Sequence, residues 1–549
     1  MALKPFLGGE PAEIKILLHA ESGMTTYKLT AARLLSGVCI GTRKGNKKMK
    51  CFHPEGIYVW DTWYYEYNGE VHCTFLQQAR PGHPERKGEN GALGHAVSRD
   101  LIHWEARPSI LYPGEKGTYD DGELWTGCTY LDGSRRYMYY AANHPTDTIC
   151  DASIGLAVSD DGEHYERHPE SPVITCDPRY YVTPDKPLKV FGHGHGHVDC
   201  RDLCVVKDPD GRGYWGYFAA RIDADECART SVIALAHSDD LVHWEQLPPC
   251  FTPNRYGCVE VPDVFYLDGK WWMLCLTGNM YGQRNRTGQP DWSLATIQAV
   301  ADRPEGPFTE VYGHEVLGSV NWQGFSSKTL LWNGSRYMFH TQGEDPCGSH
   351  FGTISFPAEL KRTGDHLSPM WCMPLEKMKK EKLLSPAEEG VPENDGRWGS
   401  IGDWHLSDRT IVGSCECDWS MRLYDGNYKN FIFEGDVTLR GAESAGLVIR
   451  AEGEDNRGGA YVILLDAVRE ELWFTMTREF PVIDRKKIPV KQDKKYNIKI
   501  IACGNVFHVF VDDILCLQLF DLHHNGGRVG LFTECGKAEF ENLSVWSID

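Results

Sequence analysis

Several kinds of segment are absent or scarce in this chain of 549 residues. No apolar run approaches the length of a membrane-spanning helix, and the N-terminal stretch lacks the apolar core and cleavage site of a signal peptide. Basic residues are outnumbered, because 57 Lys and Arg stand against 77 Asp and Glu, a formal net charge of -20. Since phosphate binding needs clustered basic side chains, we expect neither nucleic acid nor a membrane as a partner.

Paired cysteine motifs are also missing, although the chain contains 19 Cys. The thiols are scattered and no C-x-x-C occurs, which argues against a zinc site and favours a reducing compartment. Three alternating histidines could share one face of a strand, namely His193, His195 and His197. The chemistry inferred below needs no metal, so we expect no metal and no cofactor. We predict a cytoplasmic protein that acts on small, imported molecules.

What the sequence does contain is internal repetition. An Asn-Gly or Asp-Gly turn followed by an aromatic-rich strand occurs five times, at 68–69, 132–133, 210–211, 268–269 and 333–334. These dipeptides favour two-residue hairpins because both positions take positive φ. Further strand-turn segments follow three of the hairpins, as in GHAVSRDLIHW from Gly94 to Trp104. About four strands per unit predict a five-bladed β-propeller.

The character of the chain changes after about residue 365. Residues 375–396 are charged and then rich in Pro, Glu and Gly, which is typical of a linker or short helix. From about Trp398, alternating strands resume and predict an antiparallel β-sandwich. We therefore predict an all-β chain with a propeller at 1–365, a linker at 366–397 and a concanavalin-like sandwich at 398–549. The sandwich is expected to brace the propeller, and a homodimer is left open.

Three acids occupy the same phase of the repeat. Asp61, Asp202 and Glu260 each precede their turn by about eight residues, so they fall on the equivalent inner strand of three blades. In a closed ring this phase places three carboxylates around one funnel. Such a cluster suits glycosidic cleavage, in which one acid attacks the anomeric carbon and another protonates the leaving oxygen. Taken singly, each acid could instead cap a turn or pair with a surface arginine.

Segments around these acids resemble clan J of the glycoside hydrolases, which contains families 32 and 68, the invertases, levanases, inulinases and levansucrases. The segment from Leu93 to Pro113, LGHAVSRDLIHWEARPSILYP, is very similar to a family 32 segment of type WGHAxSxDLxHW. This resemblance covers nearly the whole chain. It implies that Asp61 is the nucleophile, Asp202 in CRDL the transition-state stabiliser, and Glu260 in VEVPD the acid/base.

The same resemblance implies residues that bind the sugar. Gln77 in TFLQ matches a substrate-binding glutamine, Trp125 in ELWTGC matches the aromatic of an FSG-type motif, and Arg201 matches an arginine that holds sugar hydroxyls. Trp60 replaces the asparagine of the family 32 motif WMNDPNG, and the resulting VWDTW is closer to the VWDSWP of family 68. Trp322 in NWQGF is a further candidate for lining the pocket.

The sequence thus predicts a retaining hydrolase that cleaves β-linked fructofuranosides, sucrose or fructo-oligosaccharides, through a covalent fructosyl-enzyme. The alternatives are a fructosyltransferase or difructoside-acting enzyme of the same clan, a family 43-like arabinofuranosidase or xylosidase, and a non-catalytic carbohydrate-binding protein. The GHAVSRDLIHW match and the presence of all three acids disfavour the last two. Three further acids could support the site or simply form turns: Asp120, Asp121 and Asp263.

Overall fold

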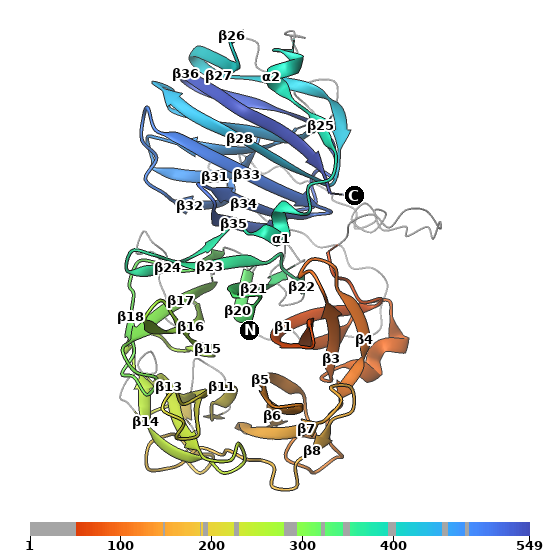
Figure 1. Cartoon of the computed structure of the whole chain (residues 1–549), viewed down its shortest axis with the longest axis vertical. Coiled ribbons are helices and arrows are strands. Elements are labelled where there is room, and N and C mark those ends of the chain that lie inside the picture. The colour runs from red at the N-terminus through yellow and green to blue at the C-terminus, as the bar shows by residue number, and fades with distance from the viewer. Residues whose placement is uncertain are drawn as a thin grey trace, which may run out of the picture. The chain divides into compact units, whose positions relative to one another are not determined.

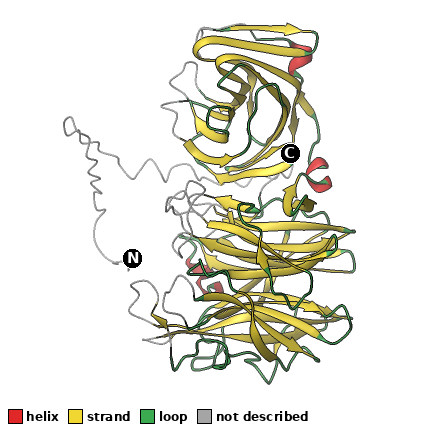
Figure 2. Cartoon of the chain, turned by 90° about the vertical axis from the view of Figure 1, so that its left-hand side faces the viewer, coloured by secondary structure: helices red, strands yellow, loops and turns green. Residues whose placement is uncertain are grey.

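The computed structural model describes residues 51–145, 149–186, 188–189, 196–223, 230–278, 294–319, 324–343, 352–392, 402–452, 459–477 and 482–548. Almost all of the regular elements in these residues are strands (Figure 1, Figure 2), which confirms the all-β class. Among the helices of the described residues, none is long and apolar enough to cross a membrane.

The first part of the described chain consists of successive groups of antiparallel strands. The first two groups are β1 (Ile57–Tyr67), β2 (Glu70–Ala79), β3 (Leu93–Ser98) and β4 (Glu105–Leu111), then β5 (Leu124–Asp132), β6 (Arg135–Pro145), β7 (Ile149–Ser159) and β8 (Glu166–Arg167). The next two are β11 (Cys200–Lys207), β12 (Tyr214–Arg221), β13 (Ser231–Ser238) and β14 (Glu245–Phe251), then β15 (Glu260–Leu267), β16 (Lys270–Gly278), β17 (Leu294–Ala301) and β18 (Thr309–Glu310). A further group is β20 (Gly324–Trp332), β21 (Ser335–Gly343), β23 (Ala358–Thr363) and β24 (His366–Met370).

Short elements complete this part of the chain. They are the 3-10 helix η2 (Pro84–Glu89), β9 (Leu188–Lys189), β10 (Gly196–His197), β19 (Leu317–Ser319) and β22 (Gly352–Ile354). The last of these pairs with both β21 and β1, and so joins the final group of strands to the first.

The predicted turns take three forms. At 68–69, 268–269 and 333–334 both residues have positive φ, as the two-residue hairpin requires. At 132–133 only Gly133 does, because Asp132 pairs with Arg135 and the glycine therefore takes the first loop position. At 210–211 the loop is longer, because the last pair before it is Lys207 with Tyr214.

The first strands of the groups form a closed ring. In sequence order β1 contacts β5, β5 contacts β11, β11 contacts β15, β15 contacts β20, and β20 contacts β1. Each of these strands slips register against its partner, in the intervals Val59/Thr62, Trp125/Gly127, Arg201/Cys204, Glu260/Asp263 and Phe325/Lys328. A bulge re-aims the side chains of a strand, so the same device is repeated around the centre of the ring.

The C-terminal part contains two packed antiparallel sheets. Their strands are β26 (Asp403–Ser407), β27 (Thr410–Tyr428), β28 (Phe431–Arg440), β29 (Ser444–Ala451), β30 (Tyr461–Asp466), β31 (Glu471–Met476), β32 (Val482–Lys487), β33 (Lys495–Cys503), β34 (Val506–Val511), β35 (Ile514–Phe520) and β36 (Gly527–Ser547). The long β36 pairs with β27, β28 and β29, and so belongs to both sheets. Between the sheets lies an apolar core that includes Phe433, Leu447 and Phe507.

The segment expected to be a linker carries elements of its own. After β24 come α1 (Met373–Glu376), β25 (Lys382–Leu384) and α2 (Pro386–Glu389), and β25 pairs with β36. Met370 of β24 pairs with Ile514 of β35. These pairings attach the segment to the sandwich strands by backbone hydrogen bonds.

Candidate active site

The three predicted acids lie at the bulges of three inner strands. Asp61 is in β1, Asp202 in β11, and Glu260 is the first residue of β15. Asp61 and Asp202 are buried, with 8% and 2% of their surface exposed, and the Glu260 side chain is 19% exposed. We refer to these residues as the acid cluster, because the charge of Glu260 raises the pKa of both Asp61 and Asp202.

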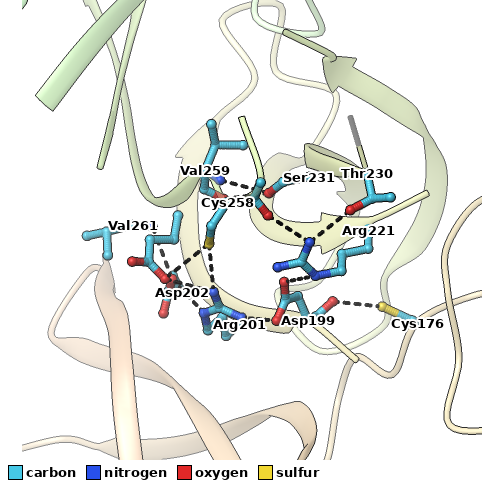
Figure 3. Close-up of polar contacts among 12 residues, drawn as sticks. Cys176, Asp199, Arg201, Asp202, Arg221, Thr230, Ser231, Cys258, Val259 and Val261 are labelled. Carbon is cyan, nitrogen blue, oxygen red and sulfur yellow. Dashed lines mark hydrogen bonds and ion pairs between the residues drawn. The ribbon is translucent and has the colours of Figure 1, made fainter. Parts of the chain in front are cut away.

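Arg201 links two members of the acid cluster. Its Nη2 lies 2.7 Å from Glu260 Oε2, and its Nε lies 3.5 Å from Asp202 Oδ2 (Figure 3). The backbone N–H of Val261 also donates to Asp202 Oδ2, at 3.0 Å. The carboxylates of Asp202 and Glu260 are therefore held side by side by one guanidinium and one backbone amide.

Burial sets the proton affinity of Asp61. It raises the pKa of this carboxyl from 3.8 to about 6, and the charge of Glu260 adds to the rise, whereas hydrogen bonds from Ser326 and Thr126 oppose it. The Thr126 hydroxyl donates to Oδ2 at 2.5 Å. At neutral pH Asp61 is therefore mostly an ionised carboxylate, which is the form that a nucleophile needs.

The pKa of Asp202 is raised further than that of Asp61. Burial is the main cause of a pKa of about 7, and the charges of Glu260 and Asp61 raise it, whereas Arg201 and the Val261 N–H lower it. Asp61 and Asp202 therefore both take up a proton at higher pH than an exposed carboxylate does. The acid cluster can therefore both hold a negative charge for attack and supply a proton to a leaving group.

An open hollow lies beside the strand position of Asp61. It is shallow and is lined by Trp60, Leu76, Gln77, Gln78, Gly91, Glu123, Leu124 and Trp125. Three of these residues are predicted sugar-binding residues, namely Trp60, Gln77 and Trp125. The indole N–H of Trp125 donates to Glu123 Oε2 at 3.3 Å, which keeps a carboxylate beside an aromatic surface. Such a mixture suits a sugar, which offers C–H faces for stacking and hydroxyls for hydrogen bonds.

The amide of Gln77 is already engaged. Its Nε2 donates to Glu89 Oε2 at 2.9 Å and to Ser109 Oγ at 2.7 Å. Both amide protons are thereby used, so the group that Gln77 can offer to a sugar hydroxyl is its carbonyl oxygen.

The remaining candidates are either not described or bonded to other residues. Trp322, His193 and His195 lie outside the described residues, and the His197 side chain does as well. Asp263 accepts the N–H and O–H of Thr329, at 3.0 and 2.6 Å, and so ties β15 to β20.

Asp120 and Asp121 also have structural partners. Asp120 is buried and accepts hydrogen bonds from Tyr140 at 3.0 Å and from Arg167 at 2.7 Å. Asp121 accepts the Gly117 N–H at 2.6 Å and lies 2.6 Å from His144 Nδ1. Both residues therefore bind partners from other segments of the chain.

Several residues near the acid cluster were missed by the sequence reasoning. Thr126 and Ser326 contact Asp61, Cys258 lies against Glu260, and the pair Asp199 and Arg221 lies next to Arg201. Thr126 and Ser326 lie at the same bulge position of their strands as the acids do, so the phase of the repeat could have identified them. Asp199 and Arg221 do not lie at this position of the repeat, so the sequence did not indicate that they lie near the acid cluster.

One group of side chains in the described residues has spacing compatible with a metal ion. It consists of His314, Asp365 and His366. The two imidazoles are stacked, with centroids 4.0 Å apart and planes 14° apart. The in-plane lone pairs of stacked rings run side by side and do not converge on one ion, and none of these residues belongs to the acid cluster.

Comparison with known proteins adds independent findings. The sequence model of the glycosyl hydrolases family 32 N-terminal domain matches residues 62–367. A sucrose-6-phosphate hydrolase of Zymomonas mobilis is 26% identical over 490 residues, 83% of this chain and 83% of that protein. A levanase of Bacillus sp. strain L7 is 26% identical over 393 residues, which are 65% of this chain but 39% of the levanase.

A solved structure shows the same architecture. Fructan 1-exohydrolase IIa from Cichorium intybus aligns with a TM-score of 0.63 and 15% sequence identity, over 91% of this chain and 97% of that chain. This likeness confirms the expected fold, a β-propeller followed by a β-sandwich.

Proposed function

Because this chain belongs to family 32 of the glycosyl hydrolases, we propose that it is a retaining enzyme that cleaves β-linked fructofuranosides through Asp61 and Glu260. The observation that carries the proposal is the acid cluster, in which an ionisable Asp61 shares its charge environment with Glu260 and Asp202. The levanase and sucrose-6-phosphate hydrolase among its relatives support fructosides as the substrate class.

In the first step the Asp61 carboxylate attacks the anomeric carbon of the fructosyl unit. The bond from this carbon to the bridging oxygen breaks, and Glu260 gives its proton to that oxygen, so that the rest of the sugar leaves as an alcohol. A covalent fructosyl-enzyme remains on Asp61. The pKa of about 6 keeps Asp61 ionised at neutral pH, which makes the attack possible without a separate base.

In the second step Glu260 takes a proton from water, and the water oxygen attacks the same carbon. The bond to Asp61 breaks, fructose is released, and both carboxyl groups return to their starting forms. Asp202 and Arg201 act throughout by holding ring hydroxyls and by balancing the positive charge that develops on the sugar.

The hollow supplies the binding surface for the sugar. Trp60 and Trp125 offer aromatic faces, and Gln77 and Glu123 offer oxygens that accept from hydroxyls. Since Trp60 replaces the usual asparagine of the family 32 motif, a sugar hydroxyl could compete with water as the acceptor in the second step. Fructosyl transfer is therefore the second candidate function.

We also propose that the enzyme works in the cytoplasm on imported disaccharides or oligosaccharides. Cys73, Cys204 and Cys275 are buried and form no disulfide, as expected in a reducing compartment. A homodimer stays a prediction.

The decisive experiment is sugar release from sucrose, inulin-type and levan-type oligosaccharides, with the wild type and Asp61→Asn side by side. Fructose release that the substitution abolishes would support both the substrate class and the nucleophile. Equal release by the two proteins would exclude Asp61 as the nucleophile. Cleavage of arabinofuranosides alone would overturn the substrate class, and fructosylated products at high sucrose concentration would identify transfer.

A further inference from the structure

A buried row of alternating charges runs behind the acid cluster (Figure 3). Arg221 Nε lies 2.5 Å from Asp199 Oδ2, and Asp199 Oδ1 forms an ion pair with Arg201 Nη1. Arg201 in turn reaches Glu260 Oε2 at 2.7 Å. Arg221 and Asp199 are only 3% and 4% exposed. The order of charges from the interior to the acid/base is therefore plus, minus, plus, minus.

The inner end of this row is anchored on both sides. Arg221 Nη1 donates to Thr230 Oγ1 at 2.8 Å and to the carbonyl of Gly257 at 2.7 Å. The backbone carbonyl of Asp199 accepts the thiol of Cys176 at 3.3 Å. Because Arg221 is bonded to the segment that leads into β15, one guanidinium holds both Asp199 and the chain that carries Glu260.

The outer end has one more contact. Cys258 Sγ lies 3.2 Å from Arg201 Nη2 and 3.6 Å from Glu260 Oε2. Burial and the charge of Glu260 hold the pKa of this thiol well above its usual range, so it is a neutral donor. The Arg201 guanidinium is thus surrounded by the carboxylates of Asp199, Asp202 and Glu260 and by the Cys258 thiol.

We propose that Arg221 and Asp199 are positioning residues, which aim the Arg201 guanidinium at the Glu260 carboxylate. This inference rests on the proposed function, in which Glu260 is the acid/base. Neither residue needs to touch the sugar, because both act through Arg201. In a buried site an ion pair is strong and poorly screened. Each charge in the row therefore partly neutralises its neighbour, and so changes how strongly that neighbour acts on the next residue.

The row makes opposite predictions for its two inner members. Removal of the Asp199 charge leaves the whole positive charge of Arg201 to the acid cluster, which favours the ionised form of the cluster. Removal of the Arg221 charge lets Asp199 neutralise more of the Arg201 charge, which favours the protonated form of the cluster. The basic limb of the pH dependence of kcat, which reports loss of the acid's proton, should therefore move in opposite directions.

The test compares Asp199→Asn, Arg221→Met and Arg221→Lys with the wild type, by kcat and KM for sucrose or fructo-oligosaccharides between pH 4 and pH 9. Lys379→Met is a matched control, because it removes another ion pair, 2.7 Å to Glu434, from a side chain that is only 10% exposed. Thermal unfolding of every variant measures the structural cost. Crystal structures of Asp199→Asn and Arg221→Met locate the Arg201 guanidinium without any need for turnover.

We expect Asp199→Asn and Arg221→Met each to lower kcat by about tenfold to a hundredfold, with a smaller effect on KM. The basic limb should move down by about half a pH unit or more in Asp199→Asn and up in Arg221→Met. Arg221→Lys should restore most of kcat, and Lys379→Met should change only the unfolding temperature.

The proposal would be overturned if both variants kept the wild-type pH dependence of kcat and if Arg201 kept its wild-type position in the crystal structures. So would losses of kcat that only follow the losses of thermal stability. If the wild type released no sugar from any fructoside, the proposed function would fail instead, and the position of Arg201 in the two crystal structures would then decide the positioning role.

Discussion

Val261 donates its backbone N–H to Asp202 Oδ2 over 3.0 Å. Both residues take positive φ, 52° and 64°, in bulges of different strands, β15 and β11. The residue next to Glu260 is thereby bonded to Asp202, so a backbone amide helps to fix the relative placement of these two acids. Strained backbone of this kind persists where the surrounding structure enforces it, and it is concentrated at functional sites.

The first prediction concerns Asp202. Asp202→Asn keeps an oxygen that can accept the Val261 N–H but removes the negative charge that balances the transition state. We expect kcat for a fructoside to fall by about 10²- to 10³-fold with KM little changed, because the charge is needed mainly in the transition state. Steady-state kinetics with sucrose checks this, and a variant that changes KM alone would show that Asp202 only binds the sugar.

The second prediction concerns the acidic limb of the pH profile. Since the pKa of Asp202 is about 7 and that of Asp61 about 6, kcat/KM should fall as the pH drops through this range and the two carboxylates take up protons. Thr126→Val removes a hydrogen bond that lowers the pKa of Asp61, so the limb should move to higher pH. The measurement is kcat/KM between pH 4 and pH 8, and a limb that stays in place or moves down in the variant would contradict the assignment.

The third prediction is that the nucleophile destabilises the fold. The pKa of Asp61 rises from 3.8 unfolded to about 6 folded, so ionised Asp61 costs about 3 kcal/mol of unfolding free energy at pH 7. The cost disappears as pH falls from 6 towards 3.8, because the folded form is protonated first. Asp61→Asn should therefore stabilise the protein by up to about 3 kcal/mol at pH 7 and by much less at pH 4.5.

Denaturant unfolding at the two pH values measures this difference. Thr62→Val, a neighbouring change that removes no charge, serves as the control. Equal effects of Asp61→Asn at both pH values would show that the gain has another origin than the buried charge.

The fourth prediction concerns a pair of buried histidines. His340 of β21 and His508 of β34 stack with ring centroids 5.5 Å apart. Within the described residues, both ring nitrogens of His508 have no hydrogen-bond partner. Burial lowers the pKa of His340 from 6.5 to about 4 and lowers that of His508 further.

A histidine with a lowered pKa is neutral in the folded protein while the unfolded chain takes up a proton. Stability is therefore complete above pH 6.5 and is lost as pH falls towards 4. Replacement of this group by an apolar ring, His340→Phe, should reduce the loss of unfolding free energy between pH 7 and pH 4.5 by about 1–3 kcal/mol. Parallel pH dependences of the variant and the wild type in denaturant unfolding would rule out this contribution.

The fifth prediction concerns substrate choice. The hollow is lined by one carboxylate, Glu123, and by no Lys or Arg among the described residues. Phosphate recognition normally uses basic side chains or clustered N–H groups. We expect kcat/KM for sucrose to exceed that for sucrose 6-phosphate by about tenfold or more. The variant Glu123→Gln should reduce this ratio of the two kcat/KM values. A preference for the phosphorylated sugar would place unidentified basic groups at the site.

The repeat and the phase of the acids were readable from the chain alone. An Asx-Gly turn is a local preference of two residues for positive φ, and the alternation of apolar residues in a strand is equally local. These preferences were enough to place Asp61, Asp202 and Glu260 on equivalent strands. The hairpin at 132–133 shows the limit, because Asp132 remains in the strand and shifts the turn by one residue.

Roles that depend on partners far along the chain could not be read in this way. The bond from Arg201 to Glu260 spans 59 residues, and the bond from Thr126 to Asp61 spans 65. Asp120 and Asp263 resemble the acid cluster as residue types, yet their partners are Arg167 and Thr329.

Local preferences of turns and strands therefore established the all-β class, the repeat and the identity of the acid cluster. The closed ring of strands determined which acids share a proton, which arginine lies between them, and which pKa values rise. Burial and long-range charge arise only when strands from different groups pack together, and for that reason no segment of the sequence carries them.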